Sequence, residues 1–375
     1  MKVLIVGGSF DNNGGRPSSL VDKFYNAFAD IATTKEEKIE VSRVNGGYFD
    51  EIEEILKETI HADVVLWWAN VPNDMPKIRD VKEVNPKCML VTSKRNDNEK
   101  YSFGELVNRA LGAKANLCVE FSKQNDGKFN MMLFDPLGNE WYKGADISKC
   151  ADVMAERLIF LKNITRQGCT WVDGEPTVPN EEAFFNLVKE NAEVFHELIN
   201  PAPGVTRFLG NSSFRCQRGF PSFKDNKMVY VSRRNVDKRY IGRDAFVPTY
   251  LEEGKVCYQG ENKPSVDTPI QLRLYDKLPN IKYMMHTHVY VEGAPFTKHM
   301  VPCGGLEEVE EVVSAIEESY GKLDGDFYAI NLVGHGSIVM GSEVEKLKNV
   351  PYVGRTLPEK QFIENNLEED KEVSL

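Results

Sequence analysis

The sequence predicts an α/β protein with two domains: an N-terminal doubly wound, Rossmann-like domain and a C-terminal α/β domain that carries a candidate metal site. The chain opens on an apolar run, Lys2–Val6, which reaches a glycine-containing loop and then a helical period. This order is typical of the start of a doubly wound domain. The 375 residues are enough for two separate cores. Periodicity is lost over Gly168–Asn180, which holds two prolines and two glycines, so we place the domain boundary there.

The first domain is expected to span residues 1–170. Ser102–Leu111 is either helical or irregular, and Ile147–Lys162 has the pattern of a helix. Further apolar runs predict more strands, the last two of which form a hairpin around the turn DPLGN. These predicted strands are Asp63–Trp68, Cys88–Thr92, Leu117–Phe121, Phe129–Phe134 and Trp141–Tyr142.

The second domain is expected to span residues 177–362, followed by an acidic, frayed tail at 363–375. Glu181–Ile199 is a strongly amphipathic helix, and short strands and loops follow it. A second helix is predicted at Leu306–Tyr320, before the apolar run Tyr328–Val333.

Composition limits the partners of this protein. Hydrophobic residues make up 41% of the chain and charged residues 27%, as in a soluble globular protein. The net charge of −11 argues against a nucleic acid or an anionic membrane as partner, while small anionic substrates remain open. Seven scattered cysteines without a CxxC pair indicate free thiols in a reducing compartment. With no signal-peptide or membrane-span pattern, we expect a cytoplasmic protein.

Three of the six histidines form the clearest chemical pattern. His286 and His288 lie two positions apart in the strand-like run Ile281–Val291, so both side chains are expected on one face of a strand. His335 is flanked by two glycines after another apolar run. One such pair alone is more often incidental, but three imidazoles with one open position are typical of a catalytic zinc site. Cys303 is expected to be a poor ligand candidate, because three histidines already suffice.

Four motifs in order carry a resemblance to a known family. Asn211 lies in GNSSFR, Asp267 in KPSVDTP, the histidine pair in HTH and His335 in GHG. This set resembles the class II aldolase/adducin family over roughly residues 181–359. The resemblance implies a class II aldolase-like α/β/α domain and a lyase that cleaves or forms a carbon–carbon bond in a phosphorylated sugar through a metal-stabilised enediolate. An epimerase, a dehydratase and a non-catalytic adducin-like binding module are the alternatives. It also implies a cyclic homotetramer with the site between subunits.

The same resemblance assigns roles to single residues. His286, His288 and His335 match the ligands of Zn²⁺ or another divalent transition metal, and Asp267 matches the catalytic acid/base. The groups that hold the substrate phosphate match Asn211, Ser212 and Ser265.

Three departures from the family pattern leave alternatives open. Arg233 and Arg234 stand where a phosphate loop is expected, so they either bind a substrate anion or are solvated surface charges. Asp267 is one methylene shorter than the family glutamate, which either moves the position of proton transfer or makes the residue a metal ligand. Asp267 could also cap the helix that starts at Thr268. The catalytic tyrosine of aldolases has no clear counterpart: Tyr290 lies too close to the histidine pair for a match, and Tyr352 is a candidate.

The loop GGSFDNNGGRPSS makes Gly7, Gly8 and Ser9 candidates for binding a cofactor or phosphate ahead of a helix N-terminus, although it is not a GxGxxG motif. Residues 2–166 have a fainter resemblance to phosphopantothenoylcysteine synthetase, carried by this loop and by MPKIRDVKEVNPKCMLVTSKRND and RALGAKANLCVEF. It implies that Lys94 matches a lysine of that family, and that the domain binds a nucleotide-like or sugar-phosphate ligand.

Overall fold

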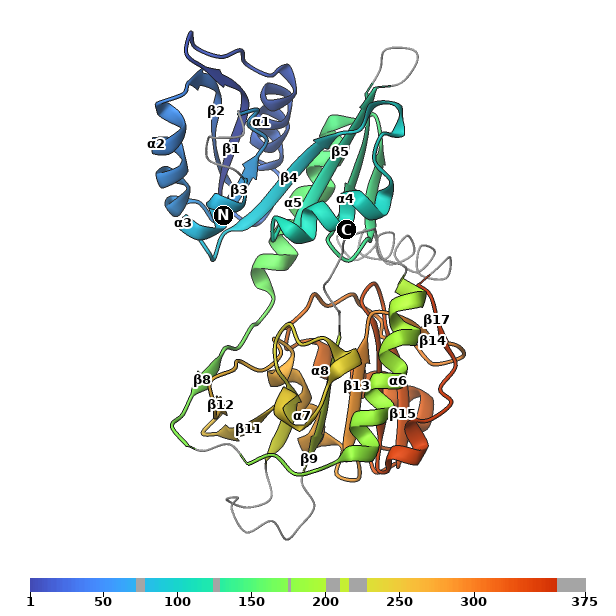
Figure 1. The fold of residues 1–375 in the computed structure, drawn as a ribbon. Coiled ribbons are helices and arrows are strands. Elements are labelled where there is room, and N and C mark those ends of the chain that lie inside the picture. Colours follow the sequence, from blue (N-terminus) through green and yellow to red (C-terminus); the bar gives the residue numbers. More distant parts are fainter. Residues whose placement is uncertain (72–77, 124–128, 175–176, 200–209, 216–227, 356–375) are drawn as a thin grey trace. The chain divides into compact units, whose positions relative to one another are not determined.

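A computed structural model describes residues 1–71, 78–123, 129–174, 177–199, 210–215 and 228–355 (Figure 1). The chain divides into two compact units, Met1–Asn163 and Ile164–Leu375, which are described one at a time below. In the described residues, no helix is long and apolar enough to cross a membrane.

The first unit is built on a seven-stranded sheet with the order β2-β1-β3-β4-β5-β6-β7. Neighbouring strands from β2 to β5 are parallel, and β5, β6 and β7 are antiparallel, so the hairpin predicted around DPLGN is confirmed. The order reverses direction at β1, which creates a crevice at the carboxyl ends of β1 and β3. The strands are β1 (Lys2–Asp11), β2 (Glu40–Tyr48), β3 (Val64–Trp67), β4 (Met89–Arg95), β5 (Leu117–Lys123), β6 (Phe129–Phe134) and β7 (Glu140–Gly144).

Helices cover both faces of this sheet. Successive side chains of a strand point to opposite faces, and in a parallel sheet both faces are buried. Val6 packs with Ile52 of α2 and Val81 of α3, whereas the neighbouring Gly7 lies against Val21 of α1. Helix α1 packs against α5 (Figure 1). The helices are α1 (Ser19–Ile31), α2 (Glu51–Glu58), α3 (Ile78–Val84), α4 (Phe103–Gly112) and α5 (Ile147–Asn163).

Two details of the first unit differ from the sequence prediction. Strand β1 continues to Asp11, so Gly7, Gly8 and Ser9 lie within a strand and not in a loop after it. Glycine permits this at Gly8, where φ is +78° and an added Cβ would lie 2.5 Å from the backbone nitrogen of Gly46. Strand β2 was not predicted, because its residues are mostly exposed or half-buried and lack an alternating apolar pattern.

The second unit contains an eight-stranded sheet with the order β15-β16-β13-β9-β10-β11-β12-β8. All pairings are antiparallel except that of β12 with β8. Strand β8 lies within the segment that the sequence predicted as a linker. The strands are β8 (Cys169–Trp171), β9 (Asn211–Arg215), β10 (Val229–Ser232), β11 (Phe246–Glu252), β12 (Lys255–Tyr258), β13 (Tyr283–Thr287), β15 (Phe327–Leu332) and β16 (Gly336–Gly341), and the short β14 (Tyr290–Val291) and β17 (Tyr352–Val353) pair separately.

Three helices complete an α/β/α arrangement around this sheet (Figure 1). Helices α7 (Thr268–Lys277) and α8 (Glu308–Tyr320) share one hydrophobic cluster with Met284 of β13. Helix α6 (Glu182–Ile199) shares the other cluster with Met285. Because side chains alternate along β13, His286 lies on the face of α7 and α8.

The run Ile281–Val291 is not one strand as expected. Strand β13 ends at Thr287 and β14 begins at Tyr290, so His288 lies in the connection just beyond β13. The strand therefore ends between the two histidines of the pair.

Candidate metal centre

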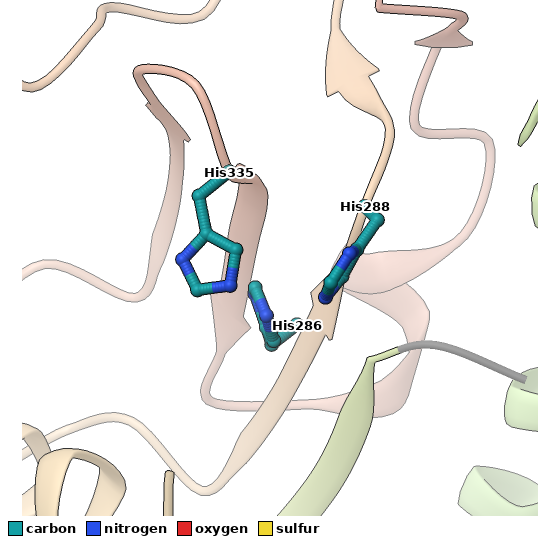
Figure 2. Close-up of side chains that lie close together, drawn as sticks. All are labelled: His286, His288 and His335. Carbon is teal, nitrogen blue, oxygen red and sulfur yellow. The ribbon is translucent and has the colours of Figure 1, made fainter. Parts of the chain in front are cut away.

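Three buried imidazoles converge in the second unit. His286, His288 and His335 each offer one ring nitrogen, and these three atoms lie within 4.8 Å of one another. The ring centroids are 4.7 Å apart for His286 and His335, 5.1 Å for His288 and His335, and 5.2 Å for His286 and His288. Figure 2 shows the rings turned toward a common point. Such a set fits the nitrogen ligands of a divalent transition metal.

The turn between β15 and β16 brings His335 to the other two histidines. Gly336, directly after His335, has φ of +147°, and an added Cβ there would lie 2.0 Å from the carbonyl oxygen of Thr287. Only glycine allows the two backbones to approach this closely. The glycine that the sequence placed beside His335 is therefore required by the contact between β16 and β13.

Hydrogen bonds fix which ring nitrogen two of the histidines can offer. The Nδ1 atom of His286 lies 3.0 Å from the carbonyl oxygen of Ser337, and its buried Nε2 atom has no hydrogen-bond partner. The Nδ1 atom of His335 lies 3.0 Å from Oε2 of Glu308, a buried carboxylate at the start of α8. Partners of this kind hold a metal-binding histidine in one tautomer and one orientation. Both rings are thereby set to bind through Nε2.

Burial dominates the electrostatics of the cluster. Burial, with a smaller contribution from His335, lowers the pKa of His286 to about 4. Burial also lowers the pKa of His288 well below its usual value. Burial opposes the charged form of His335 too, but Cys303 and Glu308 outweigh it and raise the pKa of His335 well above its usual value. Burial raises the pKa of Glu308. Near neutral pH, His286 and His288 are therefore neutral, as a metal ligand must be.

Asp267 lies beside this cluster in a network of hydrogen bonds. Its Oδ2 atom accepts from Nδ2 of Asn211 at 2.7 Å and from the hydroxyl of Ser265 at 3.4 Å. Its Oδ1 atom accepts from the backbone N–H of Gly304 at 2.9 Å. Asn211 stands opposite His286 in the pairing of β9 with β13, so the carboxylate is one residue removed from a candidate ligand.

The structure tests whether the side chain of Asp267 caps helix α7, as the sequence allowed. Asp267 occupies the N-cap position of α7, but its side chain makes no capping hydrogen bond. Its oxygens instead bind Asn211, Ser265 and Gly304. The capping alternative is therefore wrong for the side chain, and a buried carboxylate is left beside the histidines.

The three residues expected to bind the substrate phosphate do not lie together: two contact Asp267, and one lies on the opposite face of the sheet from His286. The amide of Asn211 also accepts a hydrogen bond from Gln271, so Asn211 bridges Asp267 and Gln271. Ser265 contacts Asp267 directly. Ser212 pairs with Met285, on the opposite face of the sheet from His286, and its buried hydroxyl has no partner.

Neither expected arginine contacts the histidines through its side chain in the structure as described. Arg233 is half-buried and Arg234 is exposed, and their backbone nitrogens donate to Ala245 and Lys263. The sequence did not single out Lys238, a buried lysine whose charge lowers the pKa values of His286 and His288. Arg355 was also missed; its guanidinium donates to the carbonyl oxygen of His335 at 3.0 Å.

Tyr290 and Tyr352 each contact residues that support the fold. The hydroxyl of Tyr290 accepts from the backbone N–H of Gly334 at 3.1 Å, which supports the turn that carries His335. Tyr352 packs edge-on against Phe195, its hydroxyl is buried, and burial raises its pKa.

The first unit contains a separate cavity of about 1390 Å³ at the carboxyl ends of β1, β3 and β4. Gly8 and Ser9 line it, whereas Gly7 is not among the lining residues. Its charged lining residues are all basic, and none of the described residues that line it is acidic. These basic residues are Arg16, Lys23, Lys94, Arg95 and Arg109, and the aromatic residues are Trp67, Trp68, Phe121 and Phe129.

The fold and the histidine cluster of the second unit define a class of α/β/α domain with a candidate metal site. Residues 192–291 match the family model described as Class II Aldolase and Adducin N-terminal domain. This match confirms the resemblance to the class II aldolase/adducin family that the sequence predicted for the second unit. The chain has no match among curated proteins.

Solved structures with similarity to parts of the chain have low scores. A DNA/pantothenate metabolism flavoprotein from Streptococcus pneumoniae is 10% identical with a TM-score of 0.33, and covers 43% of this chain and 99% of its own. The C-terminal domain of the coenzyme A biosynthesis bifunctional protein CoaBC is 13% identical with a TM-score of 0.30, and covers 43% and 96%. YgbL from Klebsiella pneumoniae, a putative aldolase/epimerase/decarboxylase, is 15% identical with a TM-score of 0.27, and covers 50% and 86%. Similarity at this level assigns no activity to this chain.

Proposed function

We propose that the protein is a zinc-dependent lyase of the class II aldolase type, which cleaves or forms a carbon–carbon bond in a phosphorylated sugar. The observation that carries this proposal is the cluster of three buried imidazoles with convergent nitrogens. Manganese, iron or cobalt could replace zinc, since imidazole binds all of them.

In this proposal the residues of the site have separate roles. His286, His288 and His335 hold the ion, and Glu308 and the carbonyl of Ser337 keep two of these rings in place. A bound divalent ion would supply Lewis-acid polarisation of a substrate carbonyl. Asp267 takes and returns a proton at its carboxylate, which the donors around it hold in one orientation.

Two alternatives use the same family resemblance. An epimerase or a dehydratase needs the same ion and the same proton carrier, so the site favours neither over the lyase. A non-catalytic, adducin-like binding module has no need for three convergent imidazoles, or for a buried glutamate that contacts one of them. Burial of that carboxylate costs free energy that a metal site would offset.

Metal analysis and substrate assays test this proposal together. We expect about one zinc or similar ion per chain in the purified protein, and loss of that ion in the His286→Ala/His288→Ala double variant. Incubation with a panel of ketose phosphates should release dihydroxyacetone phosphate or glycolaldehyde phosphate. A wild-type protein without metal, or a double variant that keeps its metal, would contradict the metal centre. Metal binding without turnover of any ketose phosphate would favour the non-catalytic binding module over an enzyme.

For the first unit, we propose binding of a nucleotide-like or sugar-phosphate ligand in the basic cavity. Five basic side chains without a lining carboxylate attract phosphate groups, and aromatic side chains offer a surface for an apolar or planar part. Trp67 and Trp68 line the cavity, so their fluorescence should report titration with nucleoside triphosphates and sugar phosphates. The Arg16→Gln/Arg109→Gln variant should lose the response, while Lys57→Gln, an exposed lysine outside the lining, should retain it. An equal response in both variants would contradict this site.

A further inference from the structure

Cys303, which sequence reasoning set aside as a metal ligand, lies against the candidate metal centre. Its Sγ atom is 3.1 Å from Nε2 of His335. That nitrogen is the one left for a metal, because Glu308 occupies Nδ1 of the same ring. The thiol and the ligand nitrogen therefore face the same position.

The turn that carries Cys303 is held on both sides. The backbone N–H of Gly304 donates to Asp267 at 2.9 Å, and that of Gly305 donates to the carbonyl oxygen of Pro302 at 3.0 Å. Gly305 is also tightly enclosed, since an added Cβ would lie 2.6 Å from Val301 and 3.0 Å from Ile164. These contacts fix the backbone and leave the half-exposed side chain of Cys303 beside His335.

The distance between the two atoms is close to that of two ligands on one ion. Zinc binds histidine nitrogen at about 2.0–2.1 Å and cysteine sulfur at about 2.3 Å, so a tetrahedral ion separates the two atoms by roughly 3.5 Å. A shift of a few tenths of an ångström would give these two atoms the separation of ligands on one ion. Movement of the Cys303 side chain must also bring Sγ nearer to the other two rings, because Sγ does not belong to the cluster of ring nitrogens in the described residues. Independently, Nε2 of His286 is buried and has no hydrogen-bond partner, and it belongs to the same cluster of ring nitrogens as His335, so a bound ion would satisfy it.

We propose that Cys303 is the fourth protein ligand of the ion held by His286, His288 and His335 when no substrate is bound. This inference rests on the metal centre of the proposed function. The half-exposed side chain of Cys303 can rotate away from the ion when substrate arrives, without movement of the fixed backbone. The site would then be closed at rest and open for catalysis.

Substitution with Co²⁺ tests the ligand directly. Cobalt bound to a thiolate has a sulfur-to-metal charge-transfer band in the near ultraviolet, and cobalt bound only to imidazole and oxygen does not. We expect this band in the full-length wild-type protein and its loss in Cys303→Ser and Cys303→Ala. The matched control is Cys169→Ser, since Cys169 is also a half-exposed free cysteine of the second unit, and it should retain the band.

The outcomes separate this inference from the metal centre itself. Cobalt bound to the wild type without a charge-transfer band would overturn the role of Cys303 and leave the three histidines as ligands. Failure of the wild type to bind cobalt would overturn both. A band that persists in Cys303→Ala would assign the sulfur to another cysteine and overturn the inference.

Alkylation of the wild-type protein provides a second measurement that needs no variant. Iodoacetamide should modify Cys303 slowly in the metal-loaded protein and rapidly after chelation, as followed by peptide mass spectrometry. Modification of Cys169 should not depend on the metal. Equal rates at Cys303 with and without metal would contradict the proposal.

Discussion

The Nδ1 atom of His335 lies 3.0 Å from the carboxylate of Glu308, and both side chains are almost completely buried. Residue 308 is the first residue of α8, and residue 335 lies in the turn before β16. The contact joins a helix to the turn that carries the third candidate ligand. It sets the orientation of that ligand ring and raises its affinity for a proton. The same effect should raise its affinity for a metal ion.

We expect the Glu308→Gln variant to bind zinc about 10- to 100-fold more weakly than the wild type, because glutamine accepts the same hydrogen bond without the negative charge. Glu308→Ala should lose more affinity, because the ring of His335 then has no partner at Nδ1. Competition with a chromophoric chelator measures both. Glu311→Gln is the matched control, since Glu311 lies on the same helix but binds His299. Equal affinities for all three variants would contradict a positioning role of Glu308.

Replacement of Asp267 by Asn should reduce turnover by roughly two to four orders of magnitude with metal still bound. Asparagine keeps the acceptor for Gly304 but places an amide against Asn211. Rotation of the Asn211 and Gln271 amides can restore this network, since Oε1 of Gln271 has no partner at present. Steady-state kinetics and metal analysis measure the effect. A variant that unfolds, or one that loses metal in proportion to activity, would indicate a structural role.

The affinity for the metal should rise with pH through neutrality. In the metal-free protein, the pKa of His335 is raised, so this ring carries a second proton that the metal must displace. The pKa values of His286 and His288 are lowered, so these rings are already neutral and release none. Calorimetric titration in buffers of different ionisation enthalpy should show release of at least one proton per ion near neutral pH, the one that His335 loses, besides any that a cysteine ligand gives up. Metal binding without proton release would contradict this assignment.

Gly336→Ala should destabilise the second unit by about 1–3 kcal/mol and weaken metal binding, because its Cβ would lie 2.0 Å from the carbonyl oxygen of Thr287. Gly321→Ala is the control for backbone strain alone. Gly321 has φ of +72° at the end of α8, with nothing within 4 Å of an added Cβ, and should cost only about 1 kcal/mol. Thermal unfolding and metal content compare the two variants. Normal metal binding in Gly336→Ala would show that the turn tolerates displacement.

We also expect a homotetramer, as the family resemblance implies. Several apolar side chains of the second unit are exposed in the single chain, among them Trp171, Tyr240 and Val266, the neighbour of Asp267. Subunit contacts that bury such residues would stabilise an oligomer. Light scattering should give about four times the chain mass of 42.5 kDa. A monomer would mean that the site is completed by its own chain.

The sequence alone predicted those parts of the molecule that depend on local patterns. The spacing of His286 and His288 and the glycines around His335 could be read directly, because short-range geometry decides which residues share a face or allow a tight turn. Apolar patterns also predicted strands β1, β3 to β7 and β15, and helices α1, α5, α6 and α8. Other elements were not predicted, among them β2 and β8, which have few buried side chains and depend on pairing with distant strands.

Only the tertiary structure decided which side chains surround the histidines. Glu308 meets His335 and Cys303 meets the same ring from the other side, although neither lies near His335 in the sequence. Asn211 binds Asp267 because β9 lies beside β13 under the start of α7. These contacts are set by the order of strands in the sheet and by the packing of helices on it. No local pattern in the chain encodes that order, because it results from the combined burial of segments far apart in the sequence.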